Sequence, residues 1–219
     1  MRNLELVMGW LPSLIFASRI TISLSVISVV IGMLAGVFIA LGRISANGAL
    51  RKACGIYIFI FRGTPLLMQL FFVWYALPLA IPWLAMQDRF LAACIAFSIN
   101  SAAYQAEIIR AAIQSIDPGQ MEAARSLGLT YGQAMRLVII PQSIKRLIPP
   151  VGNEFIMVLK DTSLVSTIAL VDLMKHTSQI QSSAATALVY LPSACLYLIF
   201  TAVFTFLFNY LEKRHSVYE

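Results

Sequence analysis

The sequence predicts an all-α integral membrane protein with five transmembrane helices. Of its 219 residues, 59% are hydrophobic and 12% are charged, and a typical soluble domain has about twice that share of charged residues. The apolar residues form continuous runs, not the alternating pattern of a membrane barrel, and a helix is the other structure that satisfies the backbone in lipid. At roughly 20 residues per span the chain has room for about five, so we expect residues 1–219 to form a single transmembrane domain.

The first apolar run, Ile20–Leu41, contains no charged residue. The mixed residues 1–19 are expected to form an interfacial segment or the beginning of this span. Small residues recur every four positions along the run, which predicts a helix face that packs closely against a neighbour. They are Ser28, Gly32, Gly36 and Ala40.

The second apolar run, Ala53–Leu77, is interrupted by Arg62-Gly63-Thr64-Pro65. Thr64 is a residue type that caps helices and Pro65 suits the first helical position. The pattern therefore predicts a short helix, a break and a second helix that begins at Leu66. A charged side chain at such a break needs a partner within the membrane.

Three further spans are predicted at Phe90–Ile109, Val151–Leu173 and Ala187–Leu211. A long polar interval, Arg110–Pro150, separates the third span from the fourth and contains the stretch Glu122–Pro141. Its Gly128 predicts a bend, and its Pro141 is expected to end or kink the second of two short helices. We expect a water-exposed loop over about residues 112–148.

The basic residues predict the orientation, because they gather on the cytoplasmic side of membrane proteins. Five spans place the loop after the first span, the long interval and the C-terminal tail on one side. That side is predicted to be cytoplasmic, and the N-terminus extracytoplasmic. Basic residues on the cytoplasmic side explain the net charge of +6 better than nucleic-acid binding does. The basic residues on the predicted cytoplasmic side are Arg43, Arg51, Lys52, Arg110, Arg125, Arg136, Lys145, Arg146, Lys213 and Arg214. Those on the predicted extracytoplasmic side are Arg2, Arg19, Arg89 and Lys175.

Two acidic residues lie within the fourth predicted span. Glu154 and Asp161 are seven residues apart and share a helix face with apolar neighbours. They could bind the ammonium of an amino acid; alternatively, Glu154 lies at headgroup level and Asp161 forms a structural pair with Lys160. Both interpretations remain open, whereas for Asn100 of the third span an interhelical hydrogen bond is favoured over ligand contact.

The sequence lacks the patterns of the common catalytic and metal sites. It has no GxxxxGK[ST] segment for nucleotide phosphates and no HExxH zinc motif. Its three cysteines are isolated in apolar segments and are interpreted as small hydrophobic residues. We therefore predict that the chain is not an enzyme, and we expect no metal site and no cofactor of its own.

Several motifs together resemble a known family. Glu122-Ala123-Ala124, followed by Gly128 and by Val138-Ile139-Ile140-Pro141, resembles the EAA signature of ABC-importer permeases. Phe61–Leu67 (FRGTPLL) and Leu159–Leu164 (LKDTSL) are similar to elements of the polar amino acid branch, the histidine, glutamine, arginine and cystine permease type. The resemblance covers nearly the whole chain.

The resemblance implies a type I ABC importer permease fold in a bacterial inner membrane. The implied partners are two cytoplasmic ATPase subunits, which bind ATP and Mg²⁺, a second permease that is identical or similar, and an extracytoplasmic amino-acid-binding protein. The loop would couple the permease to the ATPase through Glu122, Ala123, Ala124, Gly128 and Pro141.

The resemblance also implies a substrate site formed by Asn100, Glu154, Lys160 and Asp161. Lys160 would face a substrate carboxylate, and the acidic pair its ammonium. An acidic residue at position 154 favours a cationic amino acid. Two alternatives are a subunit without its own substrate site, whose paired permease supplies it, and a stand-alone secondary transporter that uses Glu154 and Asp161 as ion sites.

Overall fold

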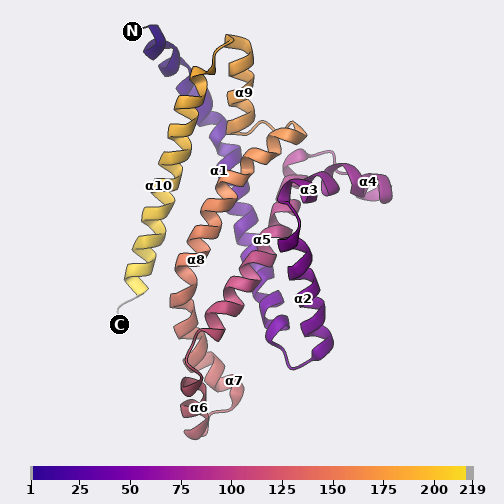
Figure 1. The fold of residues 1–219 in the computed structure, drawn as a ribbon, viewed down its shortest axis with the longest axis vertical. Helices are drawn as coiled ribbons and strands as arrows, with labels where there is room; N and C mark the ends of the chain where they lie inside the picture. The colour runs from indigo at the N-terminus through magenta and orange to yellow at the C-terminus, as the bar shows by residue number, and fades with distance from the viewer. Residues whose placement is uncertain (1, 216–219) are drawn as a thin grey trace.

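Every regular element of the described chain is a helix or a helical turn. The computed structural model describes residues 2–215, with the side chains of residues 5–214. Four long helices run lengthwise through the molecule (Figure 1): α1 (Arg2–Ile44), α5 (Arg89–Gln114), α8 (Ile140–Asp161) and α10 (Tyr190–His215). The predicted all-α fold is confirmed.

Helix α1 is much longer than the apolar run that revealed it. It has 43 residues and includes Pro12, so at 1.5 Å per residue it is about 65 Å long. The predicted span, Ile20–Leu41, is only its C-terminal half, and residues that precede this run continue the helix. Hydropathy marks the lipid-facing part of a helix and gives no signal where a helix extends beyond it.

The small-residue face of α1 packs against α5. A Cβ atom added at Gly32 would lie 2.7 Å from Cβ of Ser101, and one at Gly36 would lie 2.8 Å from Cβ of Gln105. Real Cβ atoms do not approach so closely, so both positions require glycine. The predicted packing face is confirmed.

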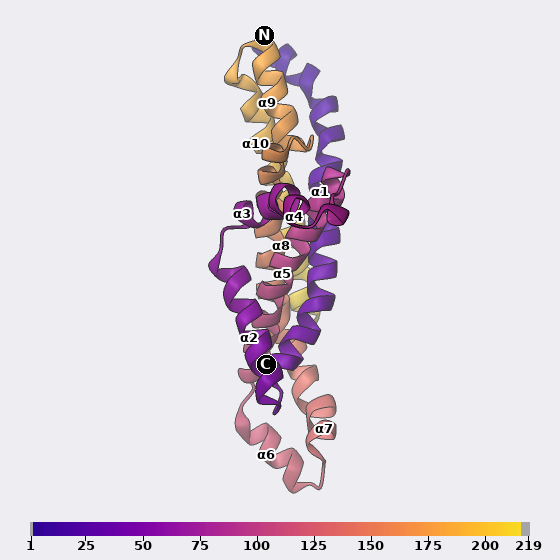
Figure 2. The ribbon, with the colours of Figure 1, turned by 90° about the vertical axis from the view of Figure 1, so that its right-hand side faces the viewer.

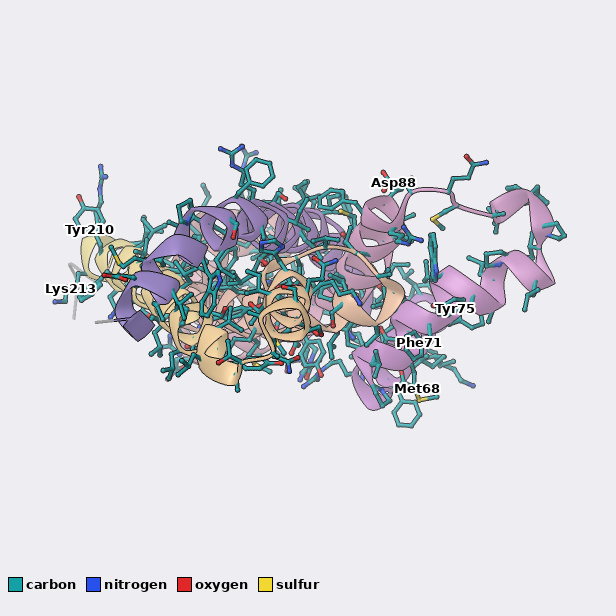
Figure 3. All side chains as sticks on the ribbon, turned by 90° about the horizontal axis from the view of Figure 1, so that it is seen from above. Met68, Phe71, Tyr75, Asp88, Tyr210 and Lys213 are labelled. Atoms are coloured by element: carbon teal, nitrogen blue, oxygen red, sulfur yellow. The ribbon has the colours of Figure 1, made fainter. Side chains whose placement is uncertain are left out.

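The second apolar run forms two helical pieces that meet at an angle of 102°. Helix α2 (Gly48–Gly63) precedes the break, and α3 (Leu66–Phe71), a turn of π-helix (Phe72–Ala76) and α4 (Leu77–Ala80) follow it. Figure 3 shows this second piece as an arm that extends away from the bundle and carries Met68, Phe71 and Tyr75. The predicted break is confirmed.

The long polar interval forms two short helices at one end of the molecule. Helices α6 (Pro118–Ser126) and α7 (Tyr131–Ala134) lie at the end opposite to α9 (Leu173–Ala184), as Figures 1 and 2 show. A turn of π-helix (Met135–Ile139) then leads directly into α8.

Two predictions about α8 are wrong. The helix covers Ile140–Asp161, not Val151–Leu173, and Pro141 does not end a helix but occupies one of its first positions. Proline is tolerated there because the first N–H groups of a helix have no partner, and the preceding π-turn joins the two helices without a stop. After Asp161 the chain tightens into a 3₁₀ segment, Thr162–Ile168, where the Thr162 hydroxyl donates to the Leu159 carbonyl at 2.7 Å.

Two described helices are long and apolar enough to cross a membrane, at Glu5–Ile44 and Ala187–Arg214, and the bent pair Gly48–Gly63 with Leu66–Ala80 makes a third if it counts as one span. The polar helices α5 and α8 are not among them. The main apolar core joins α1, α3, α5, α8 and the 3₁₀ segment through Leu24, Leu70, Phe97, Phe155 and Ile168. The five-span count therefore stays a prediction.

Candidate substrate site and coupling loop

The break between α2 and α3 is an open stretch of backbone. Thr64 and Pro65 are both extended, with ψ angles of 145° and 135°. The expected cap is not formed by Thr64: its hydroxyl donates to the Ile60 carbonyl at 2.8 Å, and Pro65 takes the N-cap position. Because proline has no side-chain acceptor, the break needs support from elsewhere.

That support comes from two buried amides. The Nδ2 atom of Asn100 donates to the Phe61 carbonyl and to Oε1 of Gln69, each at 3.0 Å. In turn, Nε2 of Gln69 donates to the Phe61 carbonyl at 2.9 Å and to the Thr64 carbonyl at 3.1 Å. The pair connects α5 to α3 and satisfies carbonyls that the break leaves without helical partners.

The amide nitrogen of Asn100 therefore donates hydrogen bonds within the protein, in agreement with the interhelical hydrogen bond that was favoured over ligand contact. Gln69 was not among the predicted site residues. The available signal was its position as an isolated polar residue in the apolar run from Leu66 to Leu77, since polar groups within membrane helices usually have a specific partner.

A cavity of about 460 Å³ opens beside the break. The backbone of residues 62–65 forms one wall, Asn100 and Tyr104 of α5 a second, and Glu154 and Asp161 of α8 a third. The prediction that the two carboxylates share one face of a helix is confirmed. Three segments that are distant in the sequence thus meet around one hollow.

The cavity contains charges of both signs. Arg62 lies 5.2 Å from the centre of the Tyr104 ring, in a cation–π contact, which supplies the partner expected for a charge at this break. Glu154 is 6% exposed and lies within electrostatic range of both Asp161 and Arg62. A zwitterion with an ammonium and a carboxylate matches this arrangement.

Lys160 does not line the cavity. Its side chain is exposed, and no ion pair joins it to Asp161 in the described part of the chain, although its charge acts on that carboxylate. Arg62, which the prediction did not assign to the substrate, is the cation that lines the same cavity as Glu154 and Asp161.

Gly128 forms the bend between α6 and α7. Its φ angle of +86° lies in the left-handed region, where glycine alone is free of strain. The Gly128 N–H donates to the Arg125 carbonyl at 3.0 Å and the Leu129 N–H to the Ala124 carbonyl at 3.2 Å, which is the Schellman pattern of a helix end. The predicted bend is confirmed.

The loop is well ordered by its own hydrogen bonds. Thr130 and Gln133 form a capping box at the start of α7, and Gln142 of α8 donates to Gln120 of α6 at 3.3 Å. The predicted coupling residues are distributed over this unit: Glu122 and Ala123 are exposed on α6, Ala124 is buried, Gly128 makes the bend, and Pro141 is exposed at the start of α8.

Residues 28–217 match the family of binding-protein-dependent transport system inner membrane components. The chain belongs to this family. It is a transport permease and not an enzyme, because the ATPase of such a system is a separate subunit. The resemblance inferred from the EAA and FRGTP segments is confirmed.

Curated relatives match the permease over nearly its whole length. It is 37% identical over 216 residues to a putative glutamine transport system permease protein, GlnP, of Rickettsia bellii, covering 96% of this chain and 97% of that one. It is 36% identical over 207 residues to the arginine transport system permease protein ArtQ of Bacillus subtilis, with 93% of each chain covered. GlnP of Escherichia coli K12 is 35% identical over 208 residues, with 94% of each chain covered.

Solved structures show the same fold as this permease. An amino acid ABC transporter solved with histidines matches with a TM-score of 0.88 and 42% identity, over 94% of this chain and 96% of that one. The inward-facing methionine transporter MetNI matches with a TM-score of 0.76 at 21% identity, over 95% of this chain and 97% of that one, which supports the fold alone.

Proposed function

We propose that this permease carries a polar, cationic amino acid across the bacterial inner membrane and binds it in the cavity beside the α2–α3 break. The observation that carries the proposal is the meeting of Arg62, Glu154 and Asp161 around one hollow of about 460 Å³. Relatives named for glutamine and arginine transport, and a solved relative with histidines, support an amino acid as the cargo.

In this proposal the two ends of the substrate are recognised by opposite charges. Glu154 and Asp161 receive the ammonium groups, and Arg62 receives the carboxylate in place of the expected Lys160. Two carboxylates against one arginine leave one negative charge in excess, which a side-chain cation of the substrate would neutralise. A neutral amino acid would leave that charge unpaired, at a cost in affinity.

We further propose five crossings, formed by α1, the broken α2–α4 segment, α5, α8 and α10. The N-terminus would be extracytoplasmic and the α6–α7 end cytoplasmic. Two observations support this orientation: basic residues gather on the α6–α7 side of the sequence, and α6 and α7 lie at the end of the molecule opposite to α9 (Figure 1).

The proposed partners are two ATPase subunits, a second permease that is identical or similar, and an extracytoplasmic binding protein. The α6–α7 unit, with Glu122 exposed on it, would dock on the ATPase. Closure of the ATPase dimer on ATP would then move the loops together and open the helices outward, and hydrolysis would reset them. A hydrogen-bonded helical pair transmits such a rigid-body motion better than an unstructured loop does.

The test is uptake and ATP hydrolysis by the reconstituted complex with its binding protein. Glu154→Gln and Asp161→Asn keep the shape of each side chain and remove its charge. We expect each to raise the half-saturating concentration of a cationic amino acid at least about tenfold, equal to about 1.4 kcal/mol of lost interaction, and to affect a neutral one less. Glu212→Gln, an exposed carboxylate near the end of α10, is the matched control.

Unchanged uptake and unchanged stimulation of hydrolysis in both variants would contradict the proposed site. That result would favour a subunit whose paired permease supplies the substrate site.

A further inference from the structure

A basic groove lies between the end of α1 and the beginning of α2. Its volume is about 660 Å³, and Arg43, Arg51 and Lys52 line it together with Gly55, Ile56 and Phe59. Among the residues that the structure describes, no carboxylate forms an ion pair with any of these three cations. Arg43 also lies within electrostatic range of Glu107, but three positive charges around one hollow that has no carboxylate in its lining favour an anionic ligand.

The groove changes from charged to apolar along α2. Lys52, Ile56 and Phe59 are spaced by four and three residues, so they share one face of the helix. Ile56 is 50% exposed and Phe59 is 79% exposed. The opposite face of α2 packs inward, where the Tyr57 hydroxyl donates to the Ile99 carbonyl of α5 at 2.7 Å. A fitting ligand therefore has an anionic head and an apolar body.

The Arg43 side chain of α1 passes close to α2 at Gly55. A Cβ atom at Gly55 would be in van der Waals contact with it, 3.4 Å from Nε and 3.6 Å from Cζ. The Arg43 side chain therefore lies at the groove that Arg51 and Lys52 of α2 also line.

The groove also lies at a suitable height. Figures 1 and 2 both place the α1–α2 turn towards the end of the molecule that carries α6 and α7, but short of their tips. If α6 and α7 protrude into water, this turn lies at the level of the lipid headgroups. An ATPase docked on α6 and α7 would lie farther out and would leave the apolar part of the groove uncovered.

We infer that the groove binds an anionic phospholipid, with its phosphate held by Arg43, Arg51 and Lys52 and its acyl chains along Ile56 and Phe59. Basic pockets between membrane helices on the cytoplasmic side bind anionic headgroups in this way. The site rests on the proposed orientation, with α6 and α7 in water on the cytoplasmic side, and does not depend on the proposed substrate.

The position of the site gives it a consequence for coupling, and this consequence rests on the proposed docking of the ATPase. Arg43 and Arg51 also line a second cavity, of about 560 Å³, together with Met121 of α6, Tyr131 of α7 and Met135 of the π-turn that follows α7. A lipid that holds the two arginines fixes one wall of the cavity that faces the coupling loop. Its loss should lower substrate-stimulated hydrolysis more than basal hydrolysis.

The experiment uses the whole complex in detergent, with phosphatidylglycerol or phosphatidylcholine added. Retained lipid is counted by native mass spectrometry, and the thermal unfolding of the permease is followed at each lipid concentration. We expect the wild type to bind phosphatidylglycerol at least about tenfold more tightly than phosphatidylcholine. The triple variant Arg43→Gln, Arg51→Gln, Lys52→Gln should lose that preference.

Two further variants keep the test decisive. The variant Arg19→Gln, Lys175→Gln, Arg214→Gln removes the same charge elsewhere and should keep the preference. Gly55→Leu keeps every charge but fills the groove, and it should reduce retained phosphatidylglycerol even if the triple variant fails to fold.

Equal binding of the two lipids by the wild type, or an unchanged preference in the triple and Gly55→Leu variants, would overturn the inference. Equal stabilisation by sodium phosphate at matched ionic strength would assign the cations to free phosphate. Loss of the ATPase subunit from the triple variant with lipid binding intact would assign them to an acidic protein surface. Each result leaves the amino acid site to its own test, because Glu154 and Asp161 are untouched.

Discussion

Asn100 and Gln69 are two neutral side chains that stabilise the break between α2 and α3, beside the charged Arg62. Neither carries charge, yet together they bind the carbonyls of Phe61 and Thr64. These bonds leave Arg62 at the edge of the cavity. The amide pair therefore positions residues 62–65, which line the proposed substrate cavity.

At the residue scale, we predict that Gln69 and Asn100 act as one unit. Gln69→Ala removes the side-chain donor to the Thr64 carbonyl and Asn100→Ala removes the donor to Oε1 of Gln69, each at a cost of about 1–3 kcal/mol. Since they share a hydrogen bond, the double variant should lower the unfolding temperature by less than the sum of the single shifts. Thermal unfolding of the purified complex checks this, with the exposed Gln179→Ala as control; strictly additive shifts would contradict it.

At the element scale, the structure depends on glycine at two kinds of position. Gly32 and Gly36 let α1 and α5 approach closely, whereas Gly128 permits a backbone angle that other residues avoid. The first kind supports the bundle and the second shapes the coupling loop. Substitutions of Gly32 or Gly36 should therefore lower the stability of the bundle, whereas substitutions of Gly128 should impair coupling.

Gly32→Val should weaken the bundle, because its Cβ would meet Cβ of Ser101 at 2.7 Å and the backbone of Ala102 at 3.1 Å. Such overpacking typically costs about 1–3 kcal/mol. The yield and unfolding temperature of the purified complex measure the effect. Gly9→Val, in the same helix with nothing within 4 Å, is the matched control, and equal stability of both variants would show that α1 and α5 do not pack as described.

Gly128→Ala should impair coupling and leave the bundle intact. A side chain at φ +86° costs about 1–2 kcal/mol, and the loop can relieve that strain by giving up its bend. We expect substrate-stimulated hydrolysis to fall while the permease still inserts and unfolds at the same temperature. Gly132→Ala, four residues along in a helix with nothing within 4 Å, should be tolerated; a Gly128 variant that couples as well as this control would argue against the loop's role.

At the scale of the whole molecule, the sequence predicted the elements better than their lengths. The second segment was broken where Arg62-Gly63-Thr64-Pro65 had indicated, since these residues disfavour a continuous helix. Helix α8 was misplaced because hydropathy reports apolar side chains, whereas this helix begins in the polar interval. The predicted run from Ile20 was only part of α1, and residues 2–19 form the beginning of this helix, as one of the two alternatives predicted. Pro141 was misread as a stop because the π-turn before it gives no signal in the sequence.

The candidate site could be predicted only in part from the sequence. Charged residues in membrane helices stand out, so Glu154 and Asp161 were found. Gln69 was missed because its role depends on Asn100, 31 residues away in the chain. Lys160 was placed at the substrate by the family resemblance, but its side chain is exposed and does not line the cavity with Asp161, because neighbours on a helix point in different directions.

The complete importer gives a prediction of its own. Liposomes that contain the permease without ATPase subunits should take up no amino acid above the background of empty liposomes, because the chain has no nucleotide-binding P-loop. Adding the ATPase subunits, the binding protein and ATP should restore uptake, measured with a radiolabelled amino acid. Uptake by the permease alone would favour the stand-alone secondary transporter.

The junction at Pro141 has a thermodynamic consequence. Because α7 and the π-turn run directly into α8, α7 and the carboxylates of Glu154 and Asp161 belong to one continuous helical segment, about 21 Å long from Ile140 to Glu154. When a ligand in the cavity and a partner at the far end each prefer one position of this segment, each changes the affinity of the other by the same factor. Binding of a substrate in the cavity should therefore change the affinity of the permease for the ATPase, even when no nucleotide is hydrolysed.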